Sequence, residues 1–90
     1  MESSLLVNAY PNPFNSSATI EFMTMDESAH ALVEVYGMSG NKVATLFDSN
    51  IEGQTFYKAE FNADKLAEGI YIYRITSGNN ITNGKLVLLK

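Results

Sequence analysis

The feature that most constrains the fold is a series of short stretches in which apolar and polar residues alternate, with turn-forming residues between them. A period of two places every second side chain on the same face of a β-strand. The clearest stretch is Gly69–Ser77, which consists almost wholly of β-forming residues. We expect Tyr71, Tyr73 and Ile75 to point inward from it. No stretch has the longer period of an extended amphipathic helix.

The same pattern predicts seven strands along the chain. They cover Leu5–Val7, Ala18–Met23, Ala31–Tyr36, Lys42–Phe47, Thr55–Phe61, Gly69–Ser77 and Ile81–Lys90. Short strands separated by turn signals are typical of an all-β fold, and we expect a seven-stranded antiparallel immunoglobulin-like β-sandwich. The first strand is expected at an edge of a sheet.

Three places depart from simple alternation. Val43 and Leu46 are three residues apart, which predicts a β-bulge in their strand. Residues 48–54 are rich in turn formers and are expected to form a loop. The segment Asn62–Glu68 could form one turn of helix, capped by Asn62 or Asp64 and ended by Gly69.

Size and composition favour one small domain held together by its packing. The chain has 90 residues, 46% of them hydrophobic and 18% charged, which is normal for a compact domain. We expect residues 1–4 to be a linker remnant and residues 5–90 to be the domain. There is no cysteine, so disulfides and thiolate nucleophiles are excluded. A formal charge of −4 argues against binding to nucleic acid.

The segment Tyr10–Asn15, with the sequence YPNPFN, is the least strand-like part of the chain. Pro11 and Pro13 have restricted φ angles and no N–H to donate, so they fit poorly in a central strand. We expect a stiff corner of the β-domain that tucks Tyr10 and Phe14 under one end. An edge surface that a partner reads is the other interpretation, and the two are compatible.

Signatures of catalysis and cofactor binding are nearly absent. The one histidine, His30, is expected on the surface, and Ser39 is expected to be a turn residue without the glycine spacing of a hydrolase. The best candidate for a metal site is a calcium-type spacing of Asp48, Asn50 and Glu52. It lacks the full calcium-loop pattern, and we predict no enzyme activity and no cofactor.

Four segments in order resemble one family. They are Tyr10–Asn15, the pair Val35-Tyr36 followed by Gly40 and Val43, the stretch Leu66–Tyr71, and the closing Lys85–Lys90. Together they are similar to the type A C-terminal sorting domain of the type IX (Por) secretion system, and the similarity covers nearly the whole chain.

The resemblance implies a function as an address and not as a catalyst. Such domains follow a cargo, an exported enzyme or adhesin, in Bacteroidetes and relatives. The outer-membrane translocon recognises the domain on the periplasmic side, and the cargo then reaches the cell surface or is secreted. In many members a sortase-like protease removes the domain. The matching residues carried over for recognition are Pro11, Asn12, Pro13, Gly69, Tyr71, Lys85, Leu86, Val87, Leu88, Leu89 and Lys90.

From these residues we predict docking through the exposed last strand and its neighbouring edge, with the proline segment closing the opposite edge. An exposed last strand could also pair with a second copy. Two other functions stay open. A carbohydrate-binding module would display an exposed row of aromatic residues, and an immunoglobulin-like accessory domain would act only as a spacer.

Overall fold

The computed structural model describes residues 5–90, which form seven β-strands and no helix. The predicted boundary at residue 4 therefore lies outside the described residues. The strands are β1 (Leu5–Tyr10), β2 (Ser17–Thr24), β3 (Ser28–Gly37), β4 (Lys42–Glu52), β5 (Tyr57–Asn62), β6 (Gly69–Ser77) and β7 (Asn80–Leu88). Residues 5–90 contain no helix with the length and apolar character needed to cross a bilayer.

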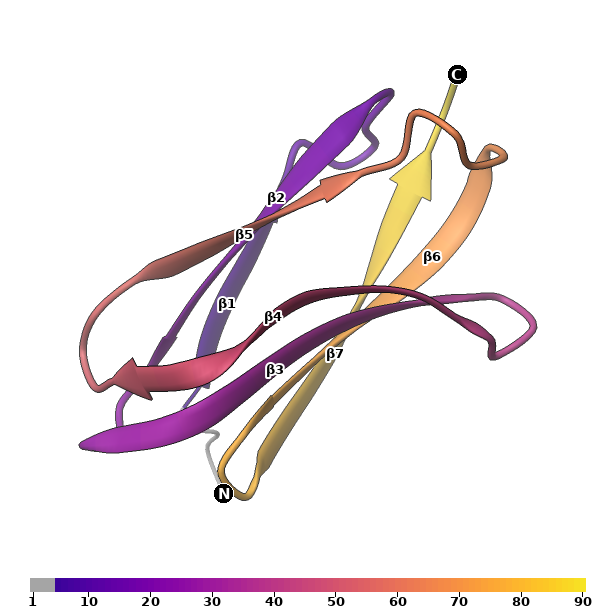
Figure 1. Ribbon diagram of the computed structural model, residues 1–90. Coiled ribbons are helices and arrows are strands. Elements are labelled where there is room, and N and C mark those ends of the chain that lie inside the picture. Colours follow the sequence, from indigo (N-terminus) through magenta and orange to yellow (C-terminus); the bar gives the residue numbers. More distant parts are fainter. Residues whose placement is uncertain (1–4) are drawn as a thin grey trace.

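The strands form two antiparallel sheets that face each other, as Figure 1 shows. One sheet has the order β1-β2-β5 and the other β4-β3-β6-β7. The all-β sandwich and the edge position of the first strand are confirmed. The fourth strand pairs with the third, whereas a constant-type immunoglobulin domain places it beside the fifth. Between the two sheets, β1 lies next to β7 and β4 next to β5.

The inward faces follow the predicted alternation. Ile20 and Phe22 of β2 are fully buried, and Tyr71, Tyr73 and Ile75 of β6 are buried as expected. The buried residues of both sheets form one hydrophobic cluster. Burial of such side chains is worth about 1.5–3 kcal/mol each, so this cluster is the main source of stability.

The strand β4 confirms one expectation and corrects another. Its register against β3 shifts twice, which leaves Val43 and Leu46 as the extra residues of the predicted bulged region. The loop expected at residues 48–54 is wrong for residues 48–52, because β4 continues to Glu52 and pairs with β3 as far as Ser28. Gly53 and Gln54 do form a turn. Ile51, which is only 2% exposed, anchors this part to the core, and strand pairing overrides the turn-forming side chains around it.

Several other bounds differ from the expected ones, since β1 continues to Tyr10, β3 begins at Ser28 and β5 begins at Tyr57. The predicted helical turn at residues 62–68 is wrong. Asp64 N donates to the Asn62 side chain (3.1 Å) and Leu66 N donates to the Ala63 carbonyl (3.0 Å), which makes two successive turns. The last strand ends at Leu88 and not at Lys90.

Aromatic residues pack inside the sandwich in two groups, one of which is formed by Phe14, Phe61 and Tyr71. Phe22, Phe47 and Tyr57 form the other group, with ring centroids 5.2–5.9 Å apart. The exposed large aromatic side chains of residues 5–90 are Tyr10 and Phe56. These two lie at opposite ends of the three-stranded sheet, because Tyr10 ends β1 and Phe56 precedes the Tyr57–Phe22 pair. They do not make the row of aromatics that a carbohydrate platform would require.

Candidate functional site

The proline segment lies against the last strand, which the sequence placed at the opposite edge. Phe14 forms a parallel β-bridge with Leu88. Phe14 N donates to the Val87 carbonyl and Leu89 N donates to the Phe14 carbonyl, both at 2.9 Å. The prediction that this segment closes the opposite edge is therefore wrong. It covers the free side of β7, next to the end of the chain.

Asn12 extends this contact with its side chain. Its amide nitrogen donates to the Lys85 carbonyl (2.8 Å), and its amide oxygen accepts from Val87 N (3.0 Å). One amide group thus supplies the donor and the acceptor that a neighbouring strand would supply. The two prolines on either side have no N–H to donate to β7, so the Asn12 side chain supplies the hydrogen bonds in place of the backbone. Both X–Pro bonds, Tyr10–Pro11 and Asn12–Pro13, are cis.

Phe14 fixes the segment to the core. Its side chain is 3% exposed, and its ring lies 5.9 Å from that of Phe61, which in turn lies 6.0 Å from the ring of Tyr71. Tyr10 is 37% exposed, so only one of the two aromatics expected under this end is buried.

The β5–β6 connection closes the same end of the sandwich. The Tyr71 hydroxyl donates to the Ala67 carbonyl (2.6 Å), which holds the connection against β6. Gly69, opposite Leu88 in the register, has φ +149°, where a side chain is strained. Lys90 N donates to the Glu68 carboxylate (3.2 Å), and Lys90 Nζ donates to the Asp64 carbonyl (2.9 Å). The chain end is therefore exposed but attached to this connection.

We call the surface formed by residues 11–15, 66–71 and 85–90 the motif end. Figure 1 shows the C-terminus beside the β5–β6 connection there. Most of the predicted recognition residues are on its surface, namely Pro11, Asn12, Pro13, Gly69, Lys85, Leu89 and Lys90. Tyr71, Leu86 and Leu88 are buried, and Val87 is half-buried, so these four have a packing role.

A small hollow opens on the motif end. It has a volume of about 290 Å³ and is lined by Pro11, Pro13, Phe14, Asn15 and Leu89. Four of its five lining residues are apolar. The Leu89 side chain at its rim is 54% exposed. The hollow could accept an apolar side chain of a partner. The sequence contained no signal for it, because periodicity does not say which segments meet.

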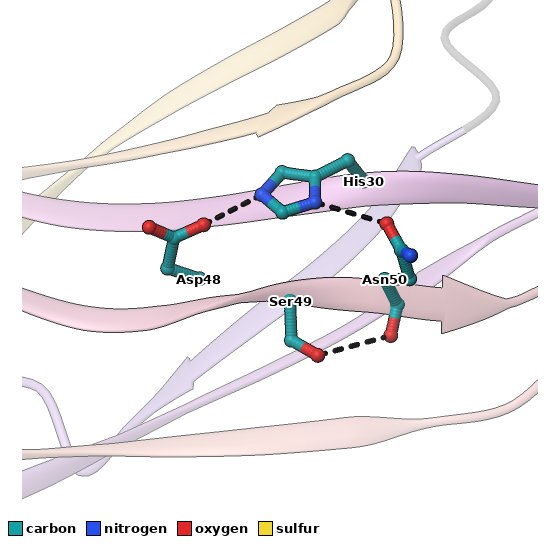
Figure 2. Close-up of polar contacts among 4 residues, drawn as sticks. All are labelled: His30, Asp48, Ser49 and Asn50. Atoms are coloured by element: carbon teal, nitrogen blue, oxygen red, sulfur yellow. Dashed lines mark hydrogen bonds and ion pairs between the residues drawn. The ribbon is translucent and has the colours of Figure 1, made fainter.

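A polar cluster lies apart from the motif end. Figure 2 shows this cluster, in which His30 lies between two side chains of β4. His30 Nε2 is 2.6 Å from Asp48 Oδ1, and Nδ1 is 3.0 Å from Asn50 Oδ1. Ser49 Oγ donates to the Asn50 carbonyl at 3.4 Å. The expected surface position of His30 is confirmed. The hydrogen bond to Asn50 and then that to Asp48 raise the His30 pKa from its usual 6.5.

The raised pKa predicts a pH dependence of stability. The stabilisation from the charged imidazole is fully present below pH 6.5 and is lost as the pH rises through the higher pKa of the folded state. The melting temperature should therefore fall as the pH rises above about 6.5, by a few degrees at most for so exposed a pair. A His30→Gln variant should show a flatter profile over this range. An equal fall in both proteins would contradict the assignment to His30.

The three residues of the calcium-type spacing all lie on β4. Among residues 5–90 there is no group of three acidic, histidine or cysteine side chains arranged to hold a metal ion. Asp48 and Asn50 contact His30 instead. Ser39, the other chemical candidate, lies in the turn between β3 and β4 as expected.

Comparison with known proteins gives the family. A model of the secretion-system C-terminal sorting domain matches residues 8–89, from within β1 to the residue after β7. The chain belongs to this family. The resemblance to type IX sorting domains is thereby confirmed over nearly the whole chain. A domain of this family is a sorting signal for export to the cell surface or the medium.

A curated relative agrees with this assignment. The chain is 32% identical over 87 residues to an endo-acting ulvan lyase from Formosa agariphila. The match covers 93% of this chain but only 15% of the lyase. The chain thus spans about one seventh of that protein's length.

Proposed function

We propose that this sorting domain directs an N-terminally attached cargo protein from the periplasm through the outer-membrane translocon of the type IX system. A sortase-like protease then removes the domain from its cargo. The domain itself is not a catalyst. The observation that carries the proposal is the exposure of motif residues at one place. Packing accounts for buried members such as Leu86 and Leu88, but not for Pro11, Pro13 and Leu89 on the surface.

The motif end is suited to recognition because hydrogen bonds hold its segments together. The proline segment is tied to β7 through Asn12 and Phe14, and Lys90 is tied to the β5–β6 connection. A partner would meet an ordered surface and would lose little conformational entropy on binding. The hollow beside Leu89 lies on this surface and would seat an apolar anchoring side chain.

Deleting residues 85–90 is a poor test of this proposal. The deletion removes Leu86 and Leu88, which are fully buried, and it would unfold the domain whatever the translocon reads. A sharper test changes the surface and leaves the core intact.

We therefore expect Leu89→Asp, in a fusion to a reporter cargo, to leave most of the cargo in the periplasm. A charge at the rim of the hollow would oppose the burial of an apolar anchor. The matched control is Ile81→Asp, because Ile81 is also on the surface (61% exposed, against 54% for Leu89) and lies at the other end of β7. The control should be sorted normally.

Cell fractionation and surface proteolysis would measure the outcome, with the size of the displayed cargo reporting removal of the domain. Both purified variants should melt close to the parent. Normal surface display of Leu89→Asp would exclude the hollow as the recognition site. Equal retention of both variants would argue for a general effect of added charge.

A further inference from the structure

A second surface lies on the outer face of the four-stranded sheet. The register places Lys42, Tyr36, Ile72 and Lys85 in one row across β4, β3, β6 and β7. Their side chains face outward, because the residues next to them along β3, β6 and β7 are buried. The row has a cation at each end and apolar residues in the middle.

The middle of this row is hollowed. The hollow has a volume of about 440 Å³ and is lined by Tyr36, Gly37, Met38, Gly40, Ile72 and Arg74. Met38 is 69% exposed at its rim. The Arg74 guanidinium lies 5.1 Å from the centre of the Tyr36 ring and is held there by a hydrogen bond from its Nε to Asn83 (3.2 Å).

The charge around this row is opposite in sign to that of the whole molecule. Lys42, Arg74 and Lys85 are three of the six basic residues in a chain of net charge −4. Glu34, the acidic residue of the adjoining row, faces Arg74 in the register and lies 3.5 Å from Lys42. The row and the adjoining row therefore carry a net positive charge and would attract an acidic partner, whereas Asp48 and Glu52 lie towards the other end of β4 on the same face.

The spacing of the row fits an extended peptide. Lys42 and Lys85 are separated by three inter-strand spacings, so their backbones lie about 14 Å apart. In an extended chain, residues i, i+2 and i+4 point to the same side, and i and i+4 are about 13 Å apart.

We propose that this face binds an extended acidic segment of a partner protein. Carboxylates at positions i and i+4 meet Lys42 and Lys85, and an apolar side chain at i+2 enters the hollow beside Tyr36 and Ile72. The inference goes beyond the proposed sorting function, because it concerns a sheet face and a defined peptide chemistry. Its test needs neither cargo nor translocon, so the two proposals can fail separately.

The test titrates the domain with the capped peptide Glu-Thr-Phe-Thr-Glu and follows backbone amide shifts by NMR. Shifts should cluster on the row and around the hollow. A peptide of the same composition with adjacent acids, Glu-Glu-Thr-Phe-Thr, should bind more weakly, because it cannot reach both lysines. Binding should also weaken as salt is raised from about 0.05 to 0.5 M.

Substitutions then locate the contact. Lys42→Glu and Lys85→Glu should each weaken binding by about two- to fivefold, as expected for an exposed ion pair. Lys58→Glu is the matched control, since this exposed lysine lies on β5 of the other sheet, and it should bind like the parent. Glu34→Gln should strengthen binding, because it removes the carboxylate that competes for Lys42.

Absence of binding at millimolar peptide would overturn the proposal, as would equal affinity for the two peptides or an equal loss in Lys58→Glu. Oligogalacturonate offers a different anionic chemistry. If oligogalacturonate shifts the amide signals of the row and the peptide does not, the face is a glycan site and the assignment to a protein partner is wrong.

Discussion

Gly53→Ala is expected to lower the free energy of unfolding by about 3 kcal/mol or more, the upper range for an overpacked site. A Cβ atom at residue 53 would lie 1.8 Å from the carbonyl oxygen of Asp26. The obstacle is backbone and not the end of a flexible side chain, so the two turns at this end of the sandwich would have to separate.

That separation would also break hydrogen bonds. Gly53 N donates to the Glu27 carbonyl (2.7 Å), and Gln54 N donates to the Thr24 carbonyl (2.8 Å). These bonds connect the β4–β5 turn with the β2–β3 turn, and so connect the two sheets. Thermal unfolding should show a fall in Tm of roughly 10–20 °C for a domain of this size.

Gly40→Ala is the control for this substitution. Gly40 has φ +93°, which strains an alanine, but nothing lies within 4 Å of the added Cβ. Its cost should be about 1–2 kcal/mol from the backbone alone. If the two variants melted at the same temperature, the close approach of the Asp26 carbonyl to Gly53 would not be the main cause of the destabilisation.

The strands and their faces could be predicted because they are local properties. The alternation around Ile20, Phe22 and Tyr71 is visible in a few consecutive residues. The side chains that it predicts to face inward are the ones that are buried in the structure. The bulges at Val43 and Leu46 were predictable for the same reason, since a bulge interrupts the period. The extension of β4 to Glu52 was not, because pairing with β3 and the burial of Ile51 decide it.

The candidate site could be predicted as a set of residues but not as a place. Asn12 and Val87 are 75 positions apart and are joined by one amide. Nothing in the local sequence of either segment tells which edge the other covers, and the sequence assigned the proline segment to the wrong one. The polar link of His30 with Asp48 and Asn50 was missed for the same reason, because it depends on the register of β3 against β4.

The second large effect is expected at the two aromatics of the proline segment. Phe14→Ala should cost about 3–5 kcal/mol, because it removes a buried ring that contacts Phe61. Tyr10→Ala should cost much less, since Tyr10 is 37% exposed and Phe14 is 3% exposed. Chemical denaturation of the two variants, which carry the same substitution four residues apart, measures the difference directly.

Hydrogen exchange would tell whether Phe14 acts on the last strand in particular. The Leu89 amide donates to the Phe14 carbonyl and the Val87 amide donates to Asn12, so both depend on the position of the proline segment. In Phe14→Ala these two amides should lose protection before those of the β3–β6 pairing, which lies inside the sheet. Uniform loss of protection would mean that Phe14 stabilises the sandwich as a whole. Selective loss would mean that the proline segment holds the end of β7 in place, and that the surface proposed for recognition depends on the burial of Phe14.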